Sequence, residues 1–505
     1  MKYDVVIIGS GLGGLECGVI LSRSGKHVLV LEREQQPGGC MQSYRRKHQA
    51  YDTGLHYVGA LAEGQSLHNV FNYLGLLNLP WQRLDADGFD QITIGSDTYS
   101  FAEGYDAFAA QLAERFPAER EALNSYVRLL QQTEDEEYSV LRPDGIFDQA
   151  FMEFLQTTNA YDYLHQSFHD ERLINVLSGS SLKMELNRST LPMFTFAHGN
   201  SGFVGSSWRL KGDGNLLVGS LINTIRQHGS EVVCGAEVQE LIEKNGRITT
   251  AVCADGTIVE GDTFISDVHP SVTLGWIKES ELIKKVYRRR INHLENTFGM
   301  LTVSLQLKDD TLPYFNHNKF VYKTDNVWTF YENTTSIDGL MISCRVPEHS
   351  DYARQIDLLT PMTWERCAAW TDTTIGHRGA EYQQLKQQLA AECIRLAETV
   401  IPGLHEMVKE SYVSTPLTYR DYTLTPDGSA YGIRKDYQNP MMTILSPRTP
   451  ISNLLLTGQN LMMHGIQGVT ATSLFTCAEI LGKEKIWNII TPNYKKYEIC
   501  ISNWR

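Results

Sequence analysis

The sequence predicts an α/β fold, in which a sheet of buried parallel strands carries a mixed α+β domain as insertions. Residues 3–8 form a short apolar run rich in Val and Ile, typical of a strand buried on both faces of a parallel sheet. Glycines follow this run directly, and a second apolar run over residues 27–31 ends at Glu32. The 505 residues are too many for one ordinary core, so two or three domains are expected.

The glycines after the first strand are spaced as a dinucleotide-binding turn requires. Gly9 permits a tight turn, Gly11 lets the backbone approach a pyrophosphate, and Gly14 lets the next helix pack closely on the strand. That helix is expected over residues 12–24, beginning at Leu12, with its free N–H groups and dipole directed at the phosphates. The order of strand, glycines and helix predicts a Rossmann-like domain.

Glu32 marks the end of the second strand. It lies close to the distance of about 20 residues at which an acidic side chain binds the hydroxyls of a ribose. The sequence therefore predicts a dinucleotide ligand with a free ribose diol.

The stretch over residues 37–59 indicates which dinucleotide is bound. A nicotinamide domain would continue into another crossover helix and strand, whereas this stretch is dense in glycine and polar residues and suits passage along an extended cofactor. Glu32, the Gly38-Gly39 doublet and the segment YDTGLHYVG over residues 51–59 resemble the flavoprotein family of phytoene desaturases, carotenoid isomerases and retinol saturases. The GLHYVG ending is most similar to the retinol saturase branch. The resemblance implies FAD and an FAD-binding domain of the glutathione reductase/amine oxidase type.

A second segment of this kind lies near the C-terminus. Residues 453–460 read as a buried strand running into a turn; Gly465, Gly468 and a helix from about residue 470 follow. A strand, a glycine turn and a helix N-terminus again form an anion site, here suited to the flavin pyrophosphate and ribityl chain. Gln459 stands where many members of the family have an acidic residue, and its amide can bond a ribityl hydroxyl.

The motifs and the resemblance together imply a set of cofactor contacts, among which Val238 meets the adenine through its backbone. The set is Gly9, Gly11, Leu12, Gly14, Glu32, Arg33, Gly38, Gly39, Met41, Gly54, Val238, Gly458, Gln459, Gly465, Gly468 and Val469. His56, Tyr57 and Tyr431 are candidate catalytic residues, as proton donors or substrate contacts, because each lies in a segment expected to border the flavin ring. A purely structural role stays open for all three, and no metal is implied.

The implied domains are discontinuous. The FAD-binding domain takes residues 1–75, 205–285 and 445–485, the substrate domain takes 76–204 and 286–444, and a tail takes 486–505. Within the substrate domain a strand is expected over residues 325–331, and the acidic run 133–137 is expected to be a solvated helix face or loop. The tail mixes aromatic and basic residues, which suits either a bilayer interface or docking on its own domain.

Composition narrows the classes of partner and compartment. A net charge of -14 argues against a nucleic acid partner, which requires a basic footprint. Nine scattered cysteines without a CxxC pair favour reduced thiols in a cytoplasmic setting. Apolar runs fall short of the roughly 18 residues of a membrane span. Peripheral contact with the inner face of a membrane stays open through the tail and the basic run 284–290.

These observations favour an FAD-dependent oxidoreductase that saturates, desaturates or isomerises a carbon–carbon double bond of a lipophilic, retinoid- or carotenoid-like polyene. Two alternatives stay open, an amine oxidase-like flavoenzyme and a flavin-binding lipid carrier or scaffold without turnover. No separate nicotinamide domain is expected, so a nicotinamide, a quinone or a partner protein all stay open as the electron partner.

Overall fold

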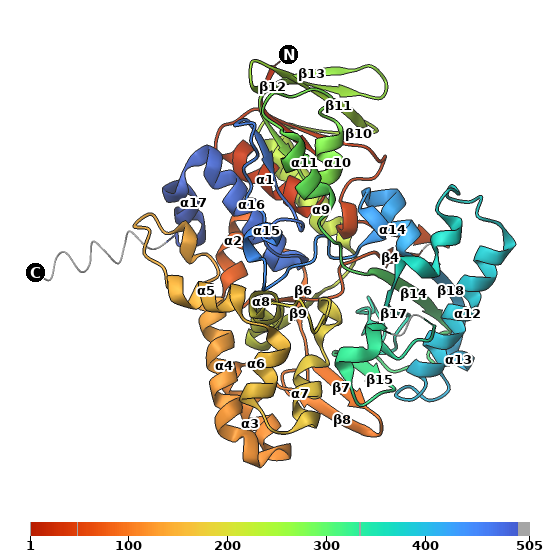
Figure 1. The fold of residues 1–505 in the computed structure, drawn as a ribbon. Helices are drawn as coiled ribbons and strands as arrows, with labels where there is room; N and C mark the ends of the chain where they lie inside the picture. Colours follow the sequence, from red (N-terminus) through yellow and green to blue (C-terminus); the bar gives the residue numbers. More distant parts are fainter. Residues whose placement is uncertain (1, 48, 333–334, 493–505) are drawn as a thin grey trace, which may run out of the picture.

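The computed structural model describes residues 2–47, 49–332 and 335–492 (Figure 1). Its first sheet has seven strands in the order β10-β2-β1-β13-β12-β11, with β19 paired to β13. Strands β10, β2, β1, β13 and β19 run parallel, which confirms the expected α/β sheet. The strands are β1 Lys2–Ile8, β2 Val28–Glu32, β10 Glu231–Cys234, β11 Val238–Lys244, β12 Arg247–Cys253, β13 Ile258–Ser266 and β19 Leu454–Leu456.

Strand β1 needs no alternation of polar and apolar residues because both of its faces are covered. Val5 and Ile7 pack into one apolar cluster, and Val6 and Ile8 pack into another on the opposite face. The first cluster lies under three helices, of which two each contact the third, α1. They are α1 Leu12–Arg23, α9 Gly214–Gln227 and α16 Gly465–Leu481.

The second sheet also has seven strands, in the order β18-β14-β17-β16-β15-β7-β8, and every pair except β15·β7 is antiparallel. Its two faces cover separate apolar clusters: Phe320 and Leu359 point to one, Val303 and Leu358 to the other. The strands are β7 Asp90–Ile94, β8 Asp97–Phe101, β14 Gly299–Leu307, β15 Asn318–Tyr322, β16 Gly339–Cys344, β17 Gln355–Met362 and β18 Val408–Ser414.

Helices flank the second sheet on both sides, with α3 to α7 at the lower left of Figure 1 and α12 and α13 at the right. The first group is α3 Tyr105–Arg115, α4 Arg120–Asp135, α5 Gln149–Thr157, α6 Ala160–Ser167 and α7 Glu171–Ser178, and α8 Met193–Gly205 packs against α4 and α5; the second group is α12 Gly379–Ala397 and α13 Leu404–Met407. The remaining helices are α2 Ser66–Leu74, α10 Pro270–Gly275, α11 Lys285–Asn292, α14 Pro416–Thr423, α15 Pro440–Thr443 and α17 Lys483–Ile490. Two small sheets pair β3 Ser43–Arg46 with β4 Gln49–Asp52, and β9 Ser207–Leu210 with both β5 Val58–Gly59 and β6 Trp81–Arg83.

The strand predicted over residues 325–331 is wrong, because a 3-10 helix, η5 Val327–Glu332, lies there. The Asn326 side chain accepts a hydrogen bond from the Trp328 backbone N–H at 3.0 Å and so starts the turn. The Trp328 ring is buried, and its indole N–H donates to Ser178 at 2.9 Å. The aromatic residues that suggested a strand serve to anchor this turn in the core.

The prediction that the acidic run 133–137 is solvated is also wrong for two of its carboxylates. Glu134 and Glu137 are buried where α4 ends, and each accepts a hydrogen bond from Gln467 of α16. Burial raises the pKa of Glu137 well above its ordinary value.

Helix α16 begins at Gly465, five residues earlier than predicted, so that Gly465 and Gly468 lie in the helix and not in the preceding turn.

The strands of the two large sheets fall in the segments predicted for the two domains, whereas the small β5-β9-β6 sheet draws on both. The domain boundaries themselves stay a prediction. The start of the predicted tail belongs to α17, whose Ile486, Trp487 and Ile490 are buried against the first domain's core. The rest of the tail, 493–505, lies outside the described residues. In the part of the chain that is described, no helix has the length and apolar character to cross a bilayer.

Candidate active site

A groove runs past the carboxyl ends of the parallel strands and encloses about 1170 Å³ of empty space, part of it open to solvent. It is lined by the loops that follow β1, β2, β13 and β19, among them Gly9, Glu32, Asp267 and Gly458. The chain crosses from β1 to β2 on one side and enters β13 on the other, so the groove lies at the point where the strand order reverses. This is the position at which open α/β sheets bind ligands. We call it the dinucleotide groove.

The glycines of the first turn are required by close contacts. Gly9 has a φ of +100°, a conformation that side chains disfavour. A Cβ at Gly11 would lie 2.4 Å from an oxygen of Asp267, and a Cβ at Gly14 would lie 2.3 Å from the carbonyl oxygen of Gly9. Gly11 therefore lets the Asp267 carboxylate approach the turn, while Gly14 lets α1 approach the end of β1.

Two helices open onto the groove with their N-termini. Gly11 precedes α1 and His464 precedes α16, and among the described residues neither supplies a side-chain cap to its helix. The first residues of both helices line the groove. Free backbone N–H groups and two helix dipoles thus meet in one space, and this arrangement favours a bound anion such as a pyrophosphate.

Glu32 lines the groove at the end of β2 and is 9% exposed. One carboxylate oxygen accepts from the Ser10 backbone N–H at 3.0 Å and from the Ser10 hydroxyl, and the other accepts from the Glu34 N–H at 2.8 Å. The Gly38 N–H in turn donates to the Ser10 hydroxyl at 3.1 Å. The carboxylate therefore ties the turn after β1 to the segment after β2, and its remaining lone pairs can accept from a ribose diol.

Asp267 is a groove residue that the sequence analysis missed. It follows β13, lines the groove, and its carboxylate lies among the backbones of Gly11, Gly13 and Gly458. Burial raises the pKa of Asp267 to about 7, although a hydrogen bond from the Gly14 backbone N–H acts in the opposite direction. Its place directly after a buried parallel strand was the signal that could have identified it.

The structure brings most of the predicted cofactor contacts together. Those that line the groove are Gly9, Gly11, Leu12, Glu32, Arg33, Gly39, Met41, Val238, Gly458, Gln459, Gly465 and Val469. Four others lie behind its wall: Gly14 and Gly38 in the contacts given above, Gly54 against the Cys40 carbonyl, and Gly468 against Met463. Their contact with a cofactor stays a prediction.

The three candidate catalytic residues line neither this groove nor the cavity next to it. The Tyr57 hydroxyl donates to Asp90 at 3.0 Å, and the Tyr431 hydroxyl donates to the Leu182 carbonyl. His56 has a buried Nε2 without a hydrogen-bond partner among the described residues, and burial lowers its pKa. Their catalytic role stays a prediction.

A second, larger space adjoins the groove and encloses about 2430 Å³, again partly open to solvent. We call it the tyrosine cavity because five tyrosines from four separate elements line it. They are Tyr44, Tyr382, Tyr412, Tyr419 and Tyr422. The groove and the cavity share the residues Glu34, Gln36, Gly39, Cys40, Gln42, Tyr422 and Thr423, so they meet at the Gly39–Gln42 turn. Burial raises the pKa of the Cys40 thiol at this junction to about 11, which keeps it neutral.

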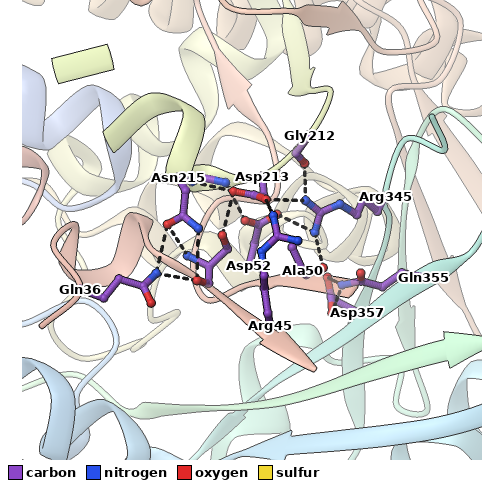
Figure 2. Close-up of polar contacts among 12 residues, drawn as sticks. Gln36, Arg45, Ala50, Asp52, Gly212, Asp213, Asn215, Arg345, Gln355 and Asp357 are labelled. Atoms are coloured by element: carbon purple, nitrogen blue, oxygen red, sulfur yellow. Dashed lines mark hydrogen bonds and ion pairs between the residues drawn. The ribbon is translucent and has the colours of Figure 1, made fainter. Parts of the chain in front are cut away.

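One arginine fixes a wall of the tyrosine cavity. Figure 2 shows Arg345, just after β16, directed toward Asp52 of β4 and Asp213 of the loop before α9. Its guanidinium donates to the carbonyls of Ala50, at 2.6 Å, and Gly212, and it lies 3.4 Å from Asp52 and 3.9 Å from Asp213. Burial raises the pKa of Asp52 to about 7, although Arg345 opposes the shift. The second sheet is thereby tied to the hairpin that lines the cavity.

The fold and the groove define a dinucleotide-binding protein with a second cavity beside the groove. The family described as flavin containing amine oxidoreductase matches residues 12–481, and the chain belongs to that family. Its cofactor is FAD.

Proteins similar to this chain include two curated relatives and a solved structure. An all-trans-retinol 13,14-reductase of Danio rerio is 23% identical, covering 95% of this chain and 86% of the relative. A chloroplastic prolycopene isomerase of Daucus carota is 24% identical, covering 85% of this chain and 72% of the relative. The crystal structure of an oxidoreductase from Methanosarcina mazei superposes with a TM-score of 0.63 at 15% identity, covering 94% of this chain and 99% of that one. The last of these shows the shared fold.

Proposed function

We propose that this protein is an FAD-dependent oxidoreductase that acts on a carbon–carbon double bond of a lipophilic polyene, of the retinoid or carotenoid kind. The observation that carries the proposal is the tyrosine cavity, which meets the dinucleotide groove at the Gly39–Gln42 turn. The names of the two relatives, a retinol reductase and a prolycopene isomerase, support the choice of a polyene.

The groove residues fit FAD on steric and electrostatic grounds. The glycines leave room where a Cβ would collide with Asp267, and the N-termini of α1 and α16 would face the pyrophosphate. Glu32 would accept the ribose hydroxyls and Val238 would lie against the adenine. When bound, FAD supplies the hydride or electron-pair chemistry.

The cavity residues would bind and orient the polyene and exclude water from it. Aromatic faces give a conjugated chain a large apolar contact area, and the tyrosine hydroxyls can form hydrogen bonds at the edge of the cavity. Tyr419 illustrates this, since its hydroxyl donates to the Thr53 carbonyl at 3.2 Å while its ring lines the cavity. Tyr422 lines both the cavity and the groove and so marks the end of the polyene that would approach the flavin.

The proposal is tested by anaerobic titration of the holoprotein. The bound flavin is reduced with dithionite, retinol, lycopene or prolycopene is added, and flavin absorbance and product mass are followed. A product heavier by two hydrogens identifies saturation, whereas an unchanged mass with altered geometry identifies isomerisation. An oxidised flavin that is reduced by a polyene identifies desaturation.

Two outcomes would contradict the proposal. One is a flavin that no polyene reoxidises or reduces but that amines reduce, and the other is a flavin that exchanges electrons with neither class. Where a polyene does react, replacing dithionite with a nicotinamide, a quinol or a reduced redox protein shows which electron partner operates.

Flotation with anionic vesicles tests peripheral membrane contact, and cell fractionation tests the predicted cytoplasmic location.

A further inference from the structure

One corner of the tyrosine cavity carries an excess of positive charge in a chain whose net charge is -14. Arg378 and Lys386 line this corner, and behind it Arg378 shares a single carboxylate, Asp421, with a third cation, Arg420. Helices α12 and α14 supply these residues, together with the turn before α12. Both helices lie on the side of the molecule that holds β4 and β18 (Figure 1).

The two arginines already share the one carboxylate. The Arg378 guanidinium donates to one oxygen of Asp421, and Arg420 lies 2.8 Å from the other. Arg378 is 8% exposed, so its charge is largely removed from water. Lys386 lies 5.3 Å above the Tyr382 ring and has no carboxylate within 4.0 Å in the part of the chain that is described. Three cations against one carboxylate leave two positive charges unmatched.

The carboxylates that line the cavity elsewhere do not neutralise this corner. Glu34 is paired with Arg33 at 2.7 Å, and Asp52 lies against Arg345. Burial lowers the pKa of Lys386, and the neighbouring Arg378 lowers it further, as expected for an ammonium without a counter-charge. An anion from outside the chain would relieve both effects.

We propose that the tyrosine cavity accepts a polyene with an anionic end, a carboxylate, which Lys386 and Arg378 hold at the α12 corner. The inference rests on the proposed function, which places the polyene in this cavity. The conjugated part of the chain then lies along the tyrosines toward the Gly39–Gln42 turn, and its acid group lies beside Arg378 and Lys386. The substrate class is therefore a polyene acid.

The test compares binding of retinoic acid and its methyl ester to the oxidised holoprotein, followed by quenching of protein fluorescence. The two probes share the polyene and differ in charge. We expect the acid to bind at least about tenfold more tightly than the ester, a difference of about 1.4 kcal/mol. Lys386→Gln should remove the difference, while Lys386→Arg keeps it. Arg395→Gln is the matched control, because it removes a cation from an exposed position of the same helix that does not line the cavity.

Three results would overturn the inference: equal binding of acid and ester to the wild type, a preference that survives in Lys386→Gln, or no binding of either probe. Unchanged FAD content in each variant shows that the protein is folded. Binding to the oxidised protein needs no turnover. Failure of this inference is therefore distinct from failure of the proposed function, which the anaerobic titration reports.

Discussion

Replacement of Glu32 by glutamine tests the dinucleotide groove most sharply. The carboxylate accepts two hydrogen bonds from Ser10 and one from the Glu34 N–H, so both of its oxygens act as acceptors. Glutamine keeps the size but turns one acceptor into an NH2 group, which must face a donor. A hydrogen bond to a charged group contributes about 1.5–3 kcal/mol. We therefore expect the free energy of unfolding of the cofactor-free protein to fall by an amount in this range.

The same substitution should weaken FAD binding, because the ribose also loses a charged acceptor. A loss of about 1.5–3 kcal/mol corresponds to a dissociation constant higher by roughly 10- to 150-fold. The assay is titration of the cofactor-free protein with FAD, followed by flavin fluorescence, together with denaturant unfolding. Glu34→Gln is the control, since that carboxylate also lines the groove but pairs with Arg33 near the surface, where a pair contributes about 0–1 kcal/mol. FAD affinity within twofold of wild type in Glu32→Gln, with reduced stability, would refute the role assigned to this carboxylate.

Three further predictions concern the groove and its support. Burial raises the Asp267 pKa from 3.8 to about 7, so its contribution to stability is lost as the pH rises through that interval. Relative to Asp267→Asn, the cofactor-free wild type should lose about 1–4 kcal/mol between pH 4 and 8, and parallel pH profiles would contradict this. Arg345→Lys keeps the charge but loses the planar fork, and should lower the free energy of unfolding by about 1–3 kcal/mol in urea, whereas an unchanged midpoint would show that its contacts are dispensable. Gly14→Ala places a Cβ 2.3 Å from the Gly9 carbonyl and should cost about 1–3 kcal/mol, while Gly18→Ala meets only the end of a flexible side chain and should cost less. Equal thermal stability of the two alanine variants would argue against the close packing of α1 on β1.

The first domain could be predicted from sequence because its signals are local. The apolar run that becomes β1 is buried on both faces, and the glycines after it have the close contacts that their spacing indicates. Helix α1 ends at Arg23, one residue short of the prediction. In each case residues near one another in the chain decide the structure.

Asp267 and the tyrosine cavity could not be predicted in the same way. Asp267 belongs to the groove only because β13 lies beside β1, a contact between residues more than 250 positions apart. The tyrosines come from four elements or turns whose proximity depends on the fold. The prediction that the acidic run at the end of α4 is solvated failed for a related reason. Local composition indicates a solvated helix, but the pairing of α4 with α8 and the Gln467 side chain bury two of its carboxylates.

The central claim is that the tyrosine cavity holds the polyene beside the flavin, and blocking that cavity tests it most directly. Gln387 lies at an exposed position of α12 and lines the cavity, whereas its neighbour Gln388 is exposed and does not. Each is replaced by tryptophan, and the rate at which a polyene reoxidises the reduced flavin is measured in single turnover together with FAD content. We expect Gln387→Trp to bind FAD normally and to lose most of the polyene-dependent rate, while Gln388→Trp behaves as the wild type. Equal rates in both variants would contradict the claim and would place the polyene elsewhere.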